Sequence, residues 1–162
     1  MNGHRKAPAR RDMVEHHPLV RRLLDSGLPA CDLLVAGSAP LLLHGYRAQI
    51  NDLDVVARGE AWTLAQHWGP TELAPYQGGA RQVNAVRPAE PGIEIFDGWF
   101  PWLFDDHEVF DRAEIIGGIR FMSLANTFRW KSRLAREKDL RDLELIGTNY
   151  PYHLRQERSF AA

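Results

Sequence analysis

The stretch 33–56, which reads LLVAGSAPLLLHGYRAQINDLDVV, constrains the fold more than any other part of the chain. Its first four residues form an apolar run whose length and composition suit a buried strand. Gly37-Ser38 then predicts a turn, and 39–43 predicts a short helix. Gly45 is expected to end that helix, because glycine adopts the left-handed conformation at this position without a steric penalty.

Two aspartates follow in the segment 51–56, the first of them fifteen positions after Gly37. If this segment is a strand, Asp52 and Asp54 share one face while Leu53 and Val55 take the other. Neighbouring carboxylates repel each other and stay ionised together only when a cation lies between them. The pattern therefore indicates a site for a metal ion and a phosphate, although Asp52 would also suit a turn or a helix cap.

The remaining apolar patterns predict a mixture of helices and strands. Helices are expected at 14–24, 60–68, 124–136 and 140–146. Strands are expected at 81–87, 93–96, 114–116 and 119–121. The first two of these strands are expected to form a hairpin beside the 52–56 strand, and Gly117-Gly118 indicates a tight turn between the last two. The fold class predicted is α/β (α+β), with a small mixed β-sheet and flanking helices.

Glu94 is the third carboxylate that the strand pattern singles out. Ile93 and Ile95 flank it on the opposite face of the predicted strand, just as Leu53 and Val55 flank the aspartates. Each strand thus presents acid on one face and aliphatic side chains on the other. Asp97 has the wrong parity relative to Glu94 and is the second choice.

These motifs resemble the nucleotidyltransferase superfamily, whose fold is shared with DNA polymerase beta. The family pattern is an apolar residue, Gly-Gly or Gly-Ser, a gap, Asp-x-Asp or Asp-x-Glu, and a third carboxylate on a later strand. Ala36-Gly37-Ser38, Asp52-x-Asp54 and Glu94 fit it here. The resemblance covers roughly 33–146 and implies a nucleotidyltransferase fold. We expect a domain at 13–148 between a flexible basic tail, 1–12, and a C-terminal tail, 149–162.

Two further motifs are similar to the small bacterial members, which include the AbiE-type (AbiEii-like) toxin nucleotidyltransferases. They are Leu43-His44-Gly45 and Lys131…Lys138-Asp139…Asp142. The resemblance implies an enzyme of a toxin–antitoxin system that moves a nucleoside monophosphate from a nucleoside triphosphate to a hydroxyl. It favours RNA, such as a tRNA end, over a protein side chain or an aminoglycoside as acceptor. A cognate partner or antitoxin protein is a further expectation. The alternative is a non-catalytic domain of this fold that acts as a binding or antitoxin partner.

The chemistry that the resemblance implies needs Mg²⁺ or Mn²⁺. Two divalent cations can polarise the acceptor hydroxyl and grip the triphosphate, and magnesium prefers oxygen ligands. By resemblance, Asp52 and Asp54 bridge the metals and Glu94 holds the acceptor-side ion. The Gly37-Ser38 turn is expected to hold the β,γ-phosphates, a role compatible with Ser38 capping the next helix.

Lys131 falls on the apolar face of the predicted 124–136 helix, together with Leu124 and Phe128. A lysine there must reach solvent or meet an anion, so it is either a surface-reaching lysine or a triphosphate contact, and the resemblance favours the contact. Asp139 is either the cap of the following helix or an active-site partner of the lysine. Lys138 lies off the apolar face and is expected to do little.

Composition bounds the partners and the compartment. The net charge of −1 excludes a surface that is basic all over, so RNA contact would need a local patch. Arg129, Arg133 and Arg136 form the one candidate stripe, whose alternative is a solvated helix face. The aromatic segment 99–104 is either core or a wall of a nucleotide pocket. A single cysteine and the absence of a leader-type or membrane-length apolar run predict a cytoplasmic protein without membrane contact.

Overall fold

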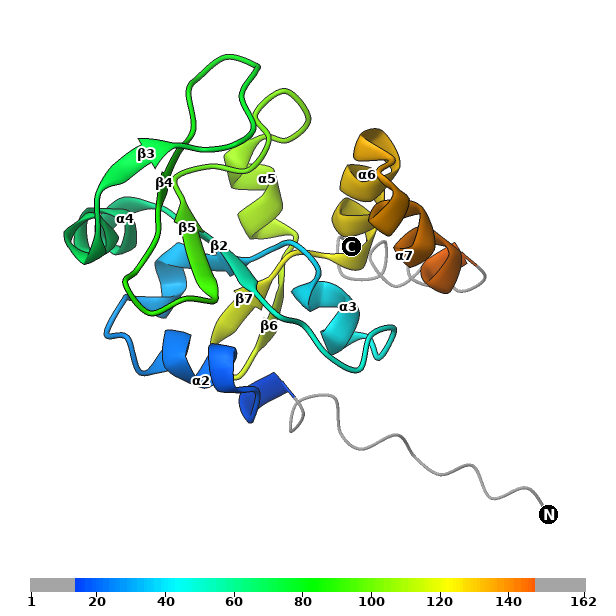
Figure 1. Ribbon diagram of the computed structural model, residues 1–162, viewed down its shortest axis with the longest axis horizontal. Helices are drawn as coiled ribbons and strands as arrows, with labels where there is room; N and C mark the ends of the chain where they lie inside the picture. Colours follow the sequence, from blue (N-terminus) through cyan, green and yellow to red (C-terminus); the bar gives the residue numbers. More distant parts are fainter. Residues whose placement is uncertain (1–13, 148–162) are drawn as a thin grey trace.

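One mixed sheet organises the computed structural model, which describes residues 14–147 (Figure 1). The sheet has seven strands in the order β3-β4-β5-β2-β1-β7-β6. The strands are β1 (Leu33–Val35), β2 (Leu53–Ala57), β3 (Thr71–Leu73), β4 (Asn84–Val86), β5 (Ile93–Phe96), β6 (Glu114–Ile116) and β7 (Ile119–Phe121). β2 runs antiparallel to β1 and parallel to β5, and β1 runs parallel to β7. The predicted class, an α/β (α+β) fold with a mixed sheet, is confirmed.

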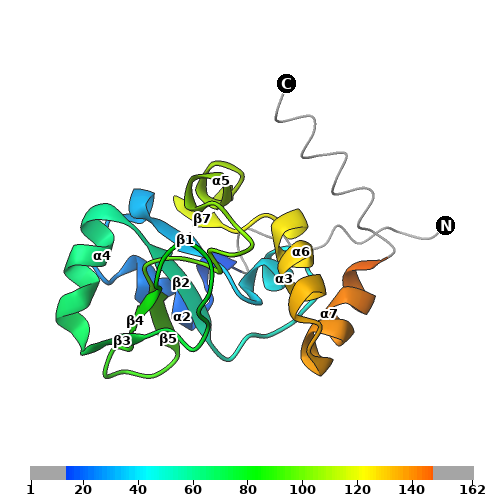
Figure 2. The same cartoon turned by 90° about the horizontal axis from the view of Figure 1, so that it is seen from above.

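Helices cover both faces of this sheet (Figures 1 and 2). They are α2 (Pro18–Leu24), α3 (Ala39–Leu43), α4 (Gly59–Ala65), α5 (Asp106–Asp111), α6 (Leu124–Leu134) and α7 (Glu137–Gly147), with short 3₁₀ turns at η1 (Ala30–Asp32) and η2 (Gln66–Trp68). In both views α6 and α7 lie together beside α3, at the opposite end of the molecule from α4. The site described below is on the side of the sheet that α6 approaches.

The strand parity read from the sequence decides which core each side chain joins. Leu53, Val55 and the flanking isoleucines of Glu94 enter the core beneath α2 and α4. Val56 and Phe96 enter the other core, with the aromatic segment, α5 and Trp130. Because side chains alternate along a strand, Asp54 and Glu94 belong to this second face.

Local signals account for several turns. Gly37 and Gly45 have φ angles of +63° and +76°, the left-handed region that glycine enters freely. Both glycines of the β6–β7 turn also have positive φ, as a two-residue hairpin of this type requires. Ser123 accepts a hydrogen bond from Asn126 N at 3.1 Å, so it caps α6 as predicted.

Other boundaries differ from the prediction. The edge strand β3 and helix α5 were not expected: β3 is exposed at every residue, so it carries no alternating pattern, and α5 has only six residues. Helix α6 ends at Leu134 because Ala135 adopts a left-handed conformation, and α7 begins at Glu137. The prediction that Asp139 caps a helix beginning at 140 is therefore wrong.

The predicted tails, 1–12 and 149–162, lie outside the described residues, as do the predicted domain boundaries. Within 14–147, no helix is both long enough and apolar enough to cross a membrane.

Candidate functional site

Asp54 and Glu94 are direct neighbours on adjacent parallel strands. The β2–β5 register pairs Asp54 with Glu94, Leu53 with Ile93 and Val55 with Ile95. In-register residues of neighbouring strands point to the same side of a sheet, so both carboxylates face the second core. Asp52 immediately precedes β2 and shares their parity.

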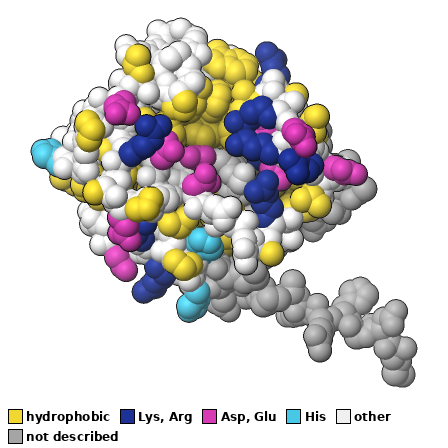
Figure 3. All heavy atoms as spheres, viewed as in Figure 1, with side chains coloured by type: hydrophobic (Ala, Val, Ile, Leu, Met, Phe, Trp, Pro, Cys, Tyr) yellow, Lys and Arg dark blue, Asp and Glu magenta, His cyan; other side chains and the backbone are white. Residues whose placement is uncertain are grey.

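A cleft of about 200 Å³ opens above this pair of strands. Three carboxylates line it, from Asp52, Asp54 and Glu94, together with Ser38 and Lys131. Figure 3 shows the arrangement on the face viewed in Figure 1: acidic side chains lie centrally, hydrophobic surface borders them on one side, and basic side chains gather over α6 and α7. The structure therefore brings five of the predicted site residues to one cleft.

The surroundings of Asp54 in this cleft disfavour the ionised form of its carboxyl group. Its pKa is raised from 3.8 to about 6. Burial is the largest cause, the charges of Asp52 and Glu94 add to it, and the charges of Lys138 and Lys131 oppose it. Desolvation and like charges both disfavour the ionised form of an acid. A cation bound beside Asp54 would relieve both effects.

Ser38 lines the cleft, and Gly37 before it packs closely against Asp54. A Cβ atom on Gly37 would collide with Asp54 Oδ2, so glycine is needed here for space as well as for its positive φ. Among the described residues, no backbone amide bonds to the Ser38 side chain as a helix cap. Its Oγ accepts a hydrogen bond from Lys131 Nζ at 3.3 Å instead. Helix α3 has only five residues, so its dipole adds little here.

Lys131 is 1% exposed, which excludes the surface-reaching interpretation. Its Nζ lies 2.8 Å from Asp142 Oδ2 and 3.5 Å from Asp139 Oδ1. Arg47 and Arg136 bind the same two carboxylates, at 2.7 and 2.6 Å respectively. Lys131 and the two carboxylates are buried, whereas Arg47 and Arg136 are partly exposed. With three cations and two anions, the cluster has one net positive charge, and its lysine donates to Ser38.

Asp139 is fully buried and bonds back to the residue that precedes α7. Its carboxylate accepts hydrogen bonds from the backbone N and the Nε of Arg136. Burial alone raises the pKa of Asp139, but the bonds from Arg136 outweigh it and hold the pKa below its ordinary value. Asp139 does not line the cleft, but it contacts two residues that do, Lys131 and Arg136.

Two basic residues of the cleft were not expected there. Arg136 and Lys138 both line it, and the charge of Lys138 lowers the pKa of Asp54. The expectation that Lys138 stands apart from the site is therefore wrong, because the left-handed turn at Ala135 redirects the chain between α6 and α7.

The three carboxylates have the chemistry of a site for a hard divalent cation, since all are oxygen donors. Within 14–147, however, no three His, Cys, Asp or Glu side chains lie close enough together to coordinate a metal ion in their present positions. Glu94 Oε2 lies 3.2 Å from Arg87 Nε. Asp97 was the second choice for the third carboxylate. It accepts hydrogen bonds from the backbone N and the side-chain Nδ2 of Asn84, so it has a structural role. The three carboxylates are suitable ligands for Mg²⁺ or Mn²⁺. To coordinate one ion together, their side chains would have to move closer to one another.

An aromatic wall, defined by Tyr76, Phe96, Trp99, Phe100 and Trp130, completes the cleft. Tyr76 stacks on Phe100 with ring centroids 3.9 Å apart, and its hydroxyl donates to Gly98 O. Burial and the charge of Asp54 raise the pKa of Tyr76, so its hydroxyl stays protonated. From the sequence, the aromatic residues of 99–104 could be named as candidates for a pocket wall, but no sequence pattern indicated Tyr76.

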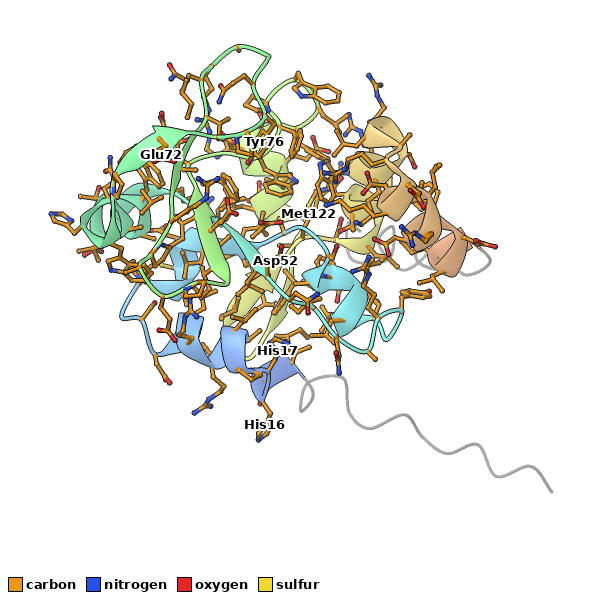
Figure 4. All side chains as sticks on the ribbon, viewed as in Figure 1. His16, His17, Asp52, Glu72, Tyr76 and Met122 are labelled. Carbon is orange, nitrogen blue, oxygen red and sulfur yellow. The ribbon has the colours of Figure 1, made fainter. Side chains whose placement is uncertain are left out.

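The labelled side chains of Figure 4 separate this site from the rest of the molecule. Asp52 lies near the centre of the view, and Tyr76 lies on the same side of the sheet as the cleft. His16 and His17 lie at the start of α2, below Asp52 in this view. Neither histidine is placed to complete a metal site with the carboxylates.

The predicted arginine stripe is exposed, with two members on α6 and Arg136 in the turn before α7, and each member contacts an aromatic ring. Arg129, Arg133 and Arg136 lie over the rings of Phe104, Trp102 and Trp130 at 5.3, 5.5 and 5.6 Å from guanidinium carbon to ring centroid. Such contacts fix the orientation of a guanidinium while leaving its N–H groups accessible. Arg136 connects the stripe to the cleft.

Comparison of the chain with protein-family models, curated proteins and solved structures gave no match. The residues of the cleft and the motifs they form are therefore the basis for a functional proposal.

Proposed function

We propose that this protein is a metal-dependent nucleotidyltransferase of the superfamily its motifs resemble. It would move a nucleoside monophosphate from a nucleoside triphosphate to a hydroxyl acceptor. One observation carries the proposal: Asp54 and Glu94 stand in register on parallel strands, in a cleft also lined by Asp52, Ser38 and Lys131.

Each group has a part in the proposed reaction. Asp52, Asp54 and Glu94 would hold Mg²⁺ or Mn²⁺. Bound ions of this kind polarise an acceptor hydroxyl and neutralise charge on a triphosphate. Lys131 and Ser38 would contact the phosphates, with Gly37 leaving the space that Asp54 needs. Asp139 would act as a positioning residue, because it contacts Lys131 and does not line the cleft.

The acceptor we propose is RNA, with a tRNA end foremost, in keeping with the resemblance to toxin nucleotidyltransferases of toxin–antitoxin systems. Arg136 of the exposed arginine stripe lines the cleft, and Arg129 and Arg133 on α6 would extend the contact along a phosphate backbone. A cognate partner or antitoxin chain would add contacts that a domain of this size lacks. We also propose that the protein works in the cytoplasm. Cys31 is an exposed free thiol, and the reducing cytoplasm keeps such thiols from oxidising.

The test is transfer itself. The protein would be incubated with magnesium or manganese, each labelled nucleoside triphosphate in turn and total cellular RNA, with label in RNA and released pyrophosphate measured. Asp54→Asn should lower the rate at least about 100-fold, as expected for loss of a preorganised electrostatic group. Glu90→Gln is the matched control, since Glu90 is exposed and lies outside the cleft; it should retain full activity.

A second candidate is a non-catalytic domain that binds nucleotide or a partner protein. Two observations favour it: the carboxylates of the described part are not grouped as metal ligands, and Lys131 is already paired with two acids. Nucleotide binding without consumption of any triphosphate, with RNA present, would establish this candidate. An unchanged rate in Asp54→Asn would also reject the proposed chemistry.

A further inference from the structure

Two buried indole N–H groups in the cleft wall lack an acceptor. Trp99 is 2% exposed and Trp130 is 5% exposed. Within the described residues, neither Nε1 atom has a hydrogen-bond partner. An indole N–H can only donate, and a buried donor is nearly always paired. Both residues line the cleft, while their Nε1 atoms are closed to solvent. A ligand in the cleft would supply the missing acceptors after a shift of the side chains that cover these atoms.

The surroundings of these donors suit a flat ring. Their two rings lie 5.1 Å apart, and Phe100 contacts both at 5.1 and 5.6 Å between centroids. Tyr76 and Phe96 extend the same wall. Aromatic surface binds planar π-systems by stacking, whichever ring is presented. Tyr76 is half-buried and the other four rings of the wall are buried, so a base would contact ring edges and the exposed part of Tyr76 beside the two unpaired donors.

The wall also adjoins the charged end of the cleft. Lys131 Nζ and Arg136 Cζ lie 4.9 and 5.6 Å from the centroid of the Trp130 ring, and Lys131 bonds to Ser38. A molecule that extends from the wall to Ser38 would therefore meet aromatic surface at one end and cations at the other. A nucleotide has this polarity.

We propose that the aromatic wall is the subsite for the nucleobase of the nucleoside triphosphate, and that the N–H groups of Trp99 and Trp130 donate to acceptor atoms on the base edge. This inference rests on the proposed function and adds to it the part of the substrate that the wall recognises. Every nucleobase carries ring nitrogens or carbonyl oxygens that accept hydrogen bonds. The wall should therefore favour any nucleoside triphosphate over a triphosphate that has no base.

The test compares triphosphates with and without a base. Isothermal titration calorimetry would measure binding of ATP, GTP, CTP, UTP and inorganic tripolyphosphate, each with magnesium. In the unaltered protein, at least one nucleotide should bind roughly 10-fold or more tightly than tripolyphosphate, the order of affinity that stacking of one base provides. This comparison needs no variant, so it does not depend on the folding of one.

Trp99→Phe and Trp130→Phe keep an aromatic ring and remove the donor. Each should weaken binding of the preferred nucleotide roughly 3- to 10-fold, as for loss of one hydrogen bond, and leave tripolyphosphate binding unchanged. Trp68→Phe is the matched control, because Trp68 packs against the core on the other face of the sheet. It should change neither affinity.

Three results would overturn the inference. Equal affinity for tripolyphosphate and all four nucleotides would remove the base subsite and leave the proposed function in place. Unaltered nucleotide affinity in both Trp→Phe variants would show that the N–H groups do not contact the base. Failure of every triphosphate to bind would reject the subsite and the proposed function together.

Discussion

The raised pKa of Asp54 makes a prediction about stability that needs no substrate. Because burial and the charges of Asp52 and Glu94 raise this pKa from 3.8 to about 6, the folded state disfavours the ionised carboxylate. At about 1.36 kcal/mol for each pKa unit, this amounts to about 3 kcal/mol at most. Partial exposure of the side chain reduces the expectation to about 1–3 kcal/mol.

Asp54→Asn should remove that penalty, and the pH dependence gives its sign. Below pH 3.8 the carboxyl is protonated in both the folded and the unfolded state, so it contributes nothing. Between 3.8 and about 6 only the unfolded state has lost the proton, so the wild type loses stability as pH rises; above 6 the full penalty is present. The free energy of unfolding of Asp54→Asn relative to wild type should therefore rise by about 1–2 kcal/mol between pH 4.5 and 7.5, since part of the penalty is already present at pH 4.5.

Urea denaturation in EDTA, followed by tryptophan fluorescence, measures this difference at each pH. Magnesium added at pH 7.5 should stabilise the wild type and have little effect on Asp54→Asn. Asp97→Asn is the contrasting control: Asp97 accepts two bonds from Asn84, so its loss should destabilise the protein at pH 7.5. A difference between Asp54→Asn and wild type that stays constant, or falls, as pH rises would refute the electrostatic account.

The remaining predictions concern Gly37, next to Asp54, and the basic residues Lys131 and Lys138 of the cleft. Gly37→Ala should lower stability and nucleotide affinity together, since its Cβ would collide with Asp54 and its φ is +63°; thermal melts and calorimetry check both. Lys131→Met should lower the free energy of unfolding by about 1.5–3 kcal/mol, the range for hydrogen bonds to charged groups, because two buried carboxylates lose one partner and keep Arg47 and Arg136. The double change with Asp142→Asn should recover part of this in urea titrations. Lys138→Met should weaken nucleotide binding, whereas Arg141→Met, outside the cleft, should leave affinity unchanged.

The stability expected of Lys131→Met shows where reasoning from sequence fails. A lysine on an apolar helix face suggests a charge whose removal is harmless or stabilising. The structure pairs it with two acids from α7, which reverses the sign. The helical period of α6 contains no information about the helix that packs against it.

The sequence by itself determined the features that depend on neighbouring residues. Alternation in 52–55 and 93–96 set which side chains of β2 and β5 share a face, and Gly37 and Gly45 set the turns around α3. Strand alternation and glycine's access to positive φ are local properties, so a reader of the chain can apply them directly.

Only the tertiary structure decided how those faces meet. The register that sets Asp54 beside Glu94, the burial of Lys131 against Asp142, and the placing of Trp130 in the wall join residues distant in the chain. Each depends on the contacts between packed elements, where many side chains compete for the same space. Local propensity cannot rank those arrangements, because the free energy that selects one arises when the sheet and its helices close on each other.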